Sequence, residues 1–150
     1  MWSFTQFVKN PSLVTEWRVM SYDLNFWRYR DEAKLRRPAE HLAAYQELCE
    51  RGDQADVPDL DELPVDEIRD KVAAIFDPKR WEMIGAGFWE SLDGSNAGIE
   101  VGVSTLAVRF DLRGGWTAED ANMLIDVMKE FGLPLFDPQV GDHGTRFTCG

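Results

Sequence analysis

Two stretches in which apolar and polar residues alternate constrain the fold more than any other feature of this sequence. In residues 22–26, a tyrosine, a leucine and a phenylalanine alternate with an aspartate and an asparagine. The same period of two recurs over residues 99–112, and its change of phase at residues 104–105 predicts a turn or a bulge between two strands. Because successive side chains of a strand point to opposite faces, each stretch indicates a strand with one buried face. A further strand is predicted over residues 81–92. Turn residues at 93–96 would join it in a hairpin to the strand that begins at residue 99.

Three helices are predicted from apolar residues at helical spacing and from residues that favour helix ends. The first has Pro38 in its first turn and stops at Gly52. The second begins at Pro64 and ends at the pair Asp77–Pro78, and the third is capped by Thr117. The third helix has a wide apolar stripe and is the best-defined helix in the sequence.

The segments next to these helices complete the order of elements. Gly132 permits the left-handed conformation that ends a helix, and Pro134 prevents its continuation. Residues 133–136 are therefore predicted to return as a short strand, either at an edge of the sheet or with an irregular beginning. Residues 53–64 are rich in acids and contain two prolines, which predicts a solvated linker without regular structure.

The resulting order of strand, helix, helix, three strands, helix and strand predicts an α+β fold. We expect a two-layer sandwich in which helices pack on one face of a mainly antiparallel sheet. This arrangement is similar to a ferredoxin-like sandwich with an inserted helix. One domain is expected over residues 20–150. Residues 1–19 form an N-terminal extension, either as an added arm or as sequence that lies upstream of a natural start at Met20.

Charge and cysteine content restrict the partners and the compartment. Sixteen basic and 27 acidic residues give a formal net charge of −11, which repels the phosphates of nucleic acids. Such a charge serves solubility alone or attracts a basic protein surface. Cys49 and Cys149 do not form a disulfide framework, which favours a reducing compartment. No apolar run approaches the ~20 residues of a membrane span, so we expect a cytoplasmic protein with no membrane partner.

No motif in the sequence indicates a catalytic or cofactor site. The glycines of residues 85–87 and 113–116 lack the spacing and the lysine of a phosphate-binding loop. We therefore predict no catalytic residue, no metal site and no cofactor. One polar set falls on predicted strands or strand ends, and ordinary ion pairing between strands explains it at least as well as a site does. It consists of Asp23, Arg109, Asp111, Asp137 and Gln139.

Acidic and aromatic residues are the candidates for binding a protein partner. Residues 53–70 hold eight acids and a single arginine, which would steer a basic partner, although a solvated linker has the same composition. Partly exposed tryptophans are frequent at the centres of protein interfaces, although most tryptophans lie in the core. The predicted partner-binding residues are Asp53, Asp56, Asp59, Asp61, Glu62, Asp66, Glu67, Trp27, Trp89 and Trp116.

Both ends of the predicted domain resemble a group of small bacterial proteins. The matching stretches are MSYDLNFW at residues 20–27, VRFDLRGGWTAEDANMLIDVMKEFG at 108–132 and LPLFDPQ at 133–139. Proteins of this group open with an MSYDL strand and close with a PLYDPQ-like end, where Phe136 stands in place of the tyrosine. The chain is also similar in size, charge and style to acidic immunity proteins of bacterial toxin systems, including contact-dependent growth inhibition.

The similarity to immunity proteins implies a non-enzymatic protein that binds a cognate toxin domain, such as a basic nuclease. Two alternatives belong to other functional classes. One is a small enzyme that uses Asp23, Arg109 and Asp137 in a cleft. The other is an adaptor that associates with itself through an exposed sheet face or edge.

Overall fold

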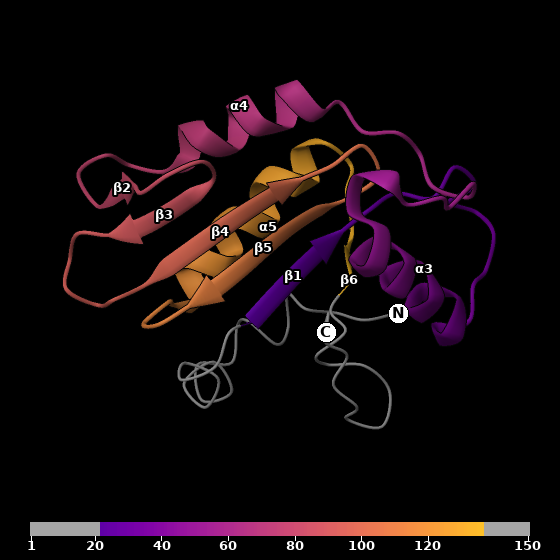
Figure 1. Ribbon diagram of the computed structural model, residues 1–150, viewed down its shortest axis with the longest axis horizontal. Coiled ribbons are helices and arrows are strands. Elements are labelled where there is room, and N and C mark those ends of the chain that lie inside the picture. The colour runs from indigo at the N-terminus through magenta and orange to yellow at the C-terminus, as the bar shows by residue number, and fades with distance from the viewer. Residues whose placement is uncertain (1–21, 137–150) are drawn as a thin grey trace.

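A computed structural model describes residues 22–136 and shows six strands in one sheet, with three α-helices and a short 3₁₀-helix (Figure 1). The strands are β1 (Tyr22–Phe26), β2 (Trp81–Met83), β3 (Phe88–Ser91), β4 (Gly98–Val103), β5 (Val108–Arg113) and β6 (Leu135–Phe136). The helices are α3 (Pro38–Arg51), η1 (Gly52–Gln54), α4 (Val65–Ile75) and α5 (Ala118–Glu130). The strands lie in the order β2-β3-β4-β5-β1-β6, and every neighbouring pair is antiparallel, which confirms the predicted α+β class.

The connectivity of four strands and two helices is ferredoxin-like. The order β1, α4, β4, β5, α5, β6 along the chain gives the neighbours β4-β5-β1-β6 in the sheet. The hairpin of β2 and β3 extends this sheet beyond β4. The prediction of one strand over residues 81–92 is wrong, because Gly85 and Gly87 adopt positive φ angles of 115° and 76° and turn the chain between β2 and β3.

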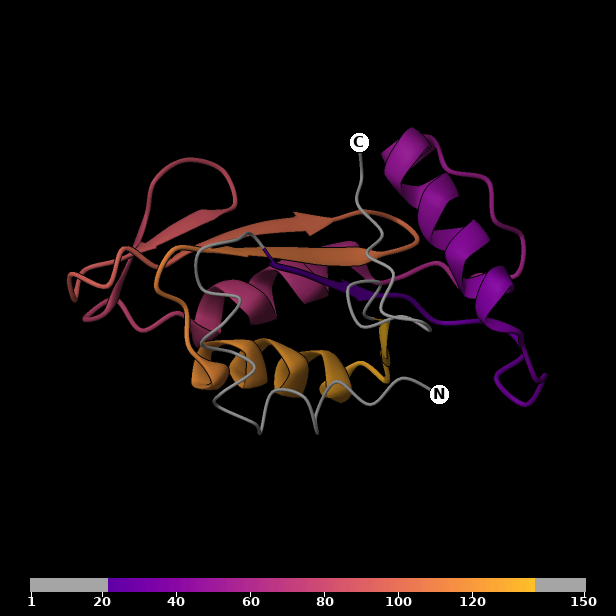
Figure 2. The ribbon, with the colours of Figure 1, turned by 90° about the horizontal axis from the view of Figure 1, so that it is seen from below.

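The helices divide between the two faces of the sheet (Figure 2). Helices α4 and α5 pack together on one face, as predicted. Helix α3 is the inserted helix, and it lies over the other face near the end of β1, so the expectation that helices pack on one face does not hold for it. No helix of residues 22–136 covers most of that second face (Figure 2).

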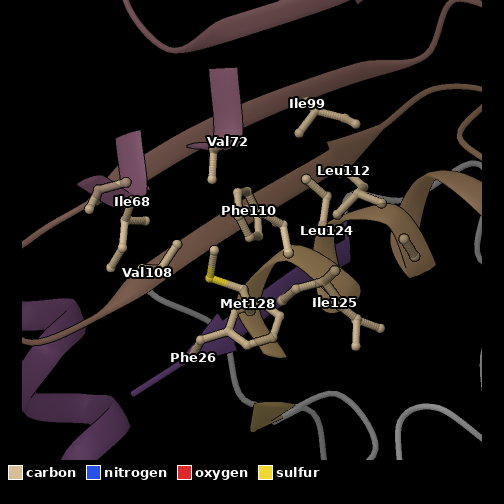
Figure 3. Close-up of a cluster of buried hydrophobic side chains, with 14 of the residues drawn as sticks. Phe26, Ile68, Val72, Ile99, Val108, Phe110, Leu112, Leu124, Ile125 and Met128 are labelled. Carbon is tan, nitrogen blue, oxygen red and sulfur yellow. The ribbon is translucent and has the colours of Figure 1, made fainter. Parts of the chain in front are cut away.

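The main core lies between the sheet and helices α4 and α5 (Figure 3). Alternate residues of the central strands meet apolar side chains of both helices, and this alternation is the pattern that predicts the strands. The fully enclosed side chains include Leu24, Phe26, Ile99, Val108, Phe110, Leu112, Ile68, Leu124 and Met128, all with 0% exposure. Burial on this scale gives the sheet one apolar face and leaves its polar side chains on the opposite face.

A smaller core attaches α3 to the end of β1. Trp27 is 1% exposed and stacks on Phe136 of β6 with ring centroids 4.1 Å apart. Tyr29 and Tyr45 are buried in the same cluster, together with Leu60 from the segment after α3. This cluster explains the change of phase after Phe26, because Trp27 and Tyr29 face away from the main core and are buried by other elements.

The prediction that residues 53–64 form a solvated linker without regular structure is wrong. Asp53 lies in η1, and Leu60 is fully buried and forms an isolated bridge with Tyr29. Backbone hydrogen bonds fix the segment on both sides of this bridge: the Arg30 amide donates to the Asp59 carbonyl at 2.7 Å, and the Asp61 amide donates to the Arg28 carbonyl at 2.8 Å. The segment is therefore held against the body of the protein, although most of its acids face solvent.

The ends of α5 follow the sequence closely. Thr117 and Asp120 form a capping box, in which the Thr117 hydroxyl accepts from the Asp120 amide and the Asp120 carboxylate accepts from the Thr117 amide. Gly132 has a φ of 68° and ends the helix. Strand β6 pairs only with β1 at an edge of the sheet, which confirms the predicted edge position of residues 133–136.

Candidate functional site

Charged side chains cluster on the second face of the sheet, where β1 and β5 lie side by side. Asp23 and Asp111 stand directly opposite each other, and Asn25 stands opposite Arg109. The Arg109 guanidinium joins the two carboxylates: its Nη2 donates to Asp23 Oδ2 at 2.7 Å and its Nε donates to Asp111 Oδ1 at 3.1 Å. When both carboxylates are ionised they repel each other, and the Arg109 guanidinium between them offsets this repulsion.

The environment of this cluster shifts the ionisation of its members. Burial raises the pKa of Asp23 from its ordinary value of 3.8 to about 7, with further contributions from hydrogen bonding and charge repulsion by Asp111 that outweigh the attraction of Arg109. Burial lowers the pKa of Arg109, but the charges of Asp23 and Asp111 overcome this effect and raise it on balance. The cluster therefore keeps a permanent cation beside a carboxyl group that holds or releases a proton near neutral pH.

A pocket of about 260 Å³ adjoins this cluster between the sheet and α3. Its lining includes Asn25 and Arg109 from the sheet, Tyr45 and Leu48 from α3, and Ala107 from the turn before β5. The predicted meeting of Asp23, Arg109 and Asp111 is confirmed, whereas Asp137 and Gln139 lie outside the described residues. Sequence reasoning missed Asn25 and Tyr45, because the strand pattern contains no signal that α3 lies over this face.

Most of the predicted acidic residues face solvent. We define the acidic surface as the six exposed acids Asp53, Asp56, Asp59, Glu62, Asp66 and Glu67. Within residues 22–136, none of the six forms an ion pair. Asp61 differs from them, because it is only partly exposed and its Oδ2 lies 3.1 Å from Arg28 Nε. Asp61 therefore fixes the segment to Arg28, just after β1, and its carboxylate is already engaged within the protein.

A groove of about 400 Å³ runs between α3 and the acidic surface. Four carboxylates line it, from Glu40 and Glu47 on α3 and from Asp56 and Asp59 on the facing segment. Two cations, Lys34 and Arg36, lie at the same groove. The Arg36 guanidinium stacks on the ring of Tyr29 at 3.7 Å, so part of its charge is engaged within the protein.

Within residues 22–136, the tryptophans do not form an aromatic patch on the surface. Trp27 and Trp116 are 1% and 0% exposed, so the expectation that they are partly exposed is wrong for both. Trp116 packs against Tyr22 of β1 in the main core. Trp89 is half-buried and stacks on Phe76 with ring centroids 4.4 Å apart. These tryptophan side chains pack within the protein. None of the three predicted tryptophans, Trp27, Trp89 and Trp116, adds an exposed ring to the acidic surface.

Three further observations bear on the functional class. No group of three or more His, Cys, Asp or Glu side chains within residues 22–136 is arranged to hold a metal ion. No helix in the same part of the chain has the length and apolar character needed to cross a membrane. Cys49 on α3 is disulfide-bonded to a partner outside the described residues, which contradicts the expectation of reduced cysteines and removes the support that they gave to a reducing compartment.

The chain matches no protein-family model, no curated protein and no solved structure. Two features of the described residues bear on function. They are the charged cluster with its pocket and the acidic surface with its groove.

Proposed function

We propose that the protein is a non-enzymatic immunity protein that binds and neutralises a cognate bacterial toxin domain with a basic surface. The observation that carries this proposal is the acidic surface, whose six exposed carboxylates form no ion pair within residues 22–136. Unpaired carboxylates gathered on one segment create a negative potential that speeds encounter with a basic partner and selects against acidic ones. The resemblance of the sequence to immunity proteins supports the identity of the partner.

The attachment of residues 53–64 to the body of the protein favours tight binding. Hydrogen bonds on both sides of Leu60 and the ion pair between Arg28 and Asp61 order the segment before a partner arrives. A binding surface that is already ordered loses less conformational entropy on association. The groove beside Asp56 and Asp59 would receive a lysine or arginine side chain of the toxin, because its four carboxylates outnumber its two cations, Lys34 and Arg36.

A nuclease fits the proposed toxin because enzymes that bind phosphate backbones present basic surfaces. An acidic inhibitor would occupy such a surface in place of the nucleic acid. The proposed compartment is the bacterial cytoplasm, and it rests on the resemblance to immunity proteins.

The test is binding to the purified product of the reading frame next to this gene, measured by isothermal titration calorimetry. Reversing two charges of the acidic surface in the double variant Asp59→Lys, Glu62→Lys should weaken binding by about 100-fold, because attraction becomes repulsion. The matched control is Glu32→Lys, Asp126→Lys, which changes the net charge equally at two exposed positions outside the acidic surface. Added salt should weaken the wild-type complex and have less effect on the variant of the acidic surface.

Equal losses in the two double variants would show that net charge alone matters and would remove the acidic surface from the proposal. Absence of binding to the neighbouring gene product, with both proteins folded, would reject the immunity function. Thermal unfolding of each variant shows whether the fold is retained, which both conclusions require.

A further inference from the structure

A loop with concentrated positive charge connects β1 to α3. We define the basic loop as residues 30–37, whose four cations and two acids, Asp31 and Glu32, leave a net positive charge in this acidic chain. The loop and α3 lie at the end of the molecule away from the β2–β3 hairpin (Figure 1, Figure 2). Within residues 22–136, none of the four cations forms an ion pair; they are Arg30, Lys34, Arg36 and Arg37. The basic loop therefore offers positive charge that the described part of the protein does not neutralise.

Leu35, in the basic loop, is an apolar side chain that the described part of the protein does not cover. It is 95% exposed, the highest value among the large exposed apolar side chains of residues 22–136. Lys34 precedes it, and Arg36 and Arg37 follow it. Interfaces commonly combine an apolar centre with a polar rim. A surface that matches this loop must offer apolar contact to Leu35 and carboxylates to its neighbours.

The groove between α3 and the acidic surface has both of these properties. Its apolar lining comes from α3 and from the facing segment, and consists of Ala43, Ala44, Val57 and Pro58. Three of its four carboxylates form no ion pair within residues 22–136, namely those of Glu40, Asp56 and Asp59. The groove is thus complementary in charge and in apolar character to the sequence around Leu35.

The basic loop does not fill the groove of its own molecule. Lys34 and Arg36 lie at this groove, but Leu35 does not line it. The Arg36 guanidinium stacks on the ring of Tyr29 at 3.7 Å and donates to the backbone carbonyls of Asp31 and Lys34 at 2.8 and 3.1 Å. These contacts hold the loop beside the groove and leave Leu35 for a second molecule.

We propose that two copies of this chain form a weak, closed dimer in which the basic loop of each copy occupies the groove of the other. Leu35 of one copy packs on the apolar lining of the second groove, and Lys34 and Arg37 pair with its carboxylates. Because loop and groove adjoin each other on one molecule, a two-fold axis beside them forms both contacts at once and closes the assembly at two copies. An anionic lipid surface would also attract the loop, but it would repel the acidic surface at the same groove.

The dimer goes beyond the proposed toxin binding, and one consequence rests on that function. The same groove would receive a basic side chain of the toxin, so the toxin would compete with the second copy. The net charge of −11 on each copy opposes association at long range. At about 150 mM salt, screening over about 8 Å weakens this repulsion more than the contacts within the interface. For an interface this small we expect a dissociation constant of about 50 µM.

Sedimentation velocity of the full chain at about 1–300 µM and about 150 mM salt measures the dimer. The wild type should change from monomer to dimer with rising concentration. Leu35→Ala should raise the dissociation constant by about tenfold or more, because this leucine is exposed in the monomer and buried only in the dimer. Leu92→Ala is the matched control: Leu92 is 55% exposed and follows β3 at the other end of the molecule, so its replacement should leave the dimer unchanged.

Exchange of charge between loop and groove gives a sharper test. The variant Lys34→Glu, Arg37→Glu and the variant Asp56→Lys, Asp59→Lys should each be monomeric alone, because each places like charges together. Mixed in equal amounts, they should form a dimer, since every loop then meets a groove of opposite charge. The control Lys79→Glu, Lys129→Glu changes the net charge as much as the loop variant does, at two exposed positions outside the loop, and should dimerise like the wild type.

Four results would overturn the proposal. They are a wild type that stays monomeric over the whole concentration range, unchanged association of Leu35→Ala or of the loop variant, no association of the two mixed charge variants when circular dichroism shows both folded, and assemblies larger than two copies. The dimer is measured without toxin. A monomeric wild type would therefore reject the dimer and leave the immunity function standing, and a failure of toxin binding would leave the dimer standing.

Discussion

Replacing Asp23 with asparagine should stabilise the protein above neutral pH and remove a large part of its pH dependence. Asp23 lies 2.7 Å from Arg109 and opposite Asp111, with only 14% of its side chain exposed. Its pKa is raised from 3.8 to about 7, chiefly by burial. A raised pKa means that the folded protein binds this proton more tightly than the unfolded chain does.

The sign and size of the effect follow from this difference in proton binding. Between about pH 4 and pH 7 the folded protein keeps a proton that the unfolded chain has released, so wild-type stability falls as the pH rises through this range. The two pKa values correspond to a loss on the order of 4 kcal/mol once Asp23 is ionised in the folded protein. Asparagine cannot ionise and still offers an oxygen to Arg109, so the variant avoids this loss.

Urea denaturation followed by tryptophan fluorescence, at several pH values from 4 to 8, measures the effect. The free energy of unfolding of Asp23→Asn minus that of the wild type should increase by at most about 1.4 kcal/mol per pH unit and level off above about pH 7. Glu100→Gln is the control, because Glu100 lies opposite Asp111 on the other neighbouring strand and is exposed. A difference between Asp23→Asn and the wild type that stays constant over the whole range would refute the assignment of a raised pKa to Asp23.

Two further predictions concern the stability of the fold, and both are measured by urea denaturation. Gly114→Ala should cost about 3 kcal/mol or more, because its new Cβ would collide with the backbone carbonyl of Asn96, whereas Gly94→Ala, also at positive φ but with open space around the Cβ, should cost about 1 kcal/mol. Equal costs would show that backbone conformation, and not the close approach, decides the effect at Gly114. Thr117→Ala should cost about 1 kcal/mol through loss of the capping box at α5, whereas Thr105→Ala, at an exposed position, should change stability by less than about 0.5 kcal/mol. A loss at Thr117 no larger than that at Thr105 would contradict a stabilising role for the cap.

The sequence predicts the central sheet well because local pattern and burial agree there. The alternation that begins at Tyr22 and the one that includes Phe110 each place one set of side chains in the main core. The capping signal at Thr117 and the stop at Gly132 fix both ends of α5 through chemistry within a few residues. Such short-range signals need no knowledge of distant parts of the chain.

The errors occur where contacts between distant residues decide the structure. Leu60 is one apolar residue among acids, and the segment is fixed by its bridge to Tyr29 and by the contacts of its neighbours with Arg28 and Arg30. Trp27 has the side chain of an interface residue, but Phe136 and α3 cover it. In both cases the position of a partner far along the chain determines burial, and no local pattern contains that information.

In the candidate site, too, local pattern predicts one part and contacts between distant residues decide the other. The meeting of Asp23, Arg109 and Asp111 follows from strand register, which the alternating pattern constrains. The pocket depends on where α3 lies relative to the second face, and neither the helix pattern nor its caps specify this. Asn25 therefore reads in sequence as an ordinary polar strand residue, and its burial is visible only in the structure.

The position of β1 between β5 and β6 has a consequence for the order of events on the ribosome. Asp23 and its partner Arg109 are 86 residues apart, and β6 is made later still. At translation rates of about 5–20 residues per second, β1 leaves the ribosome about 4–17 s before β5 can join it. During that interval both of its hydrogen-bonding edges lack their final neighbours, which is when a nascent chain is most open to aggregation or to capture by a chaperone. Strand β1, which lies one strand from the β6 edge of the sheet, is thus made before its neighbours and paired after a delay.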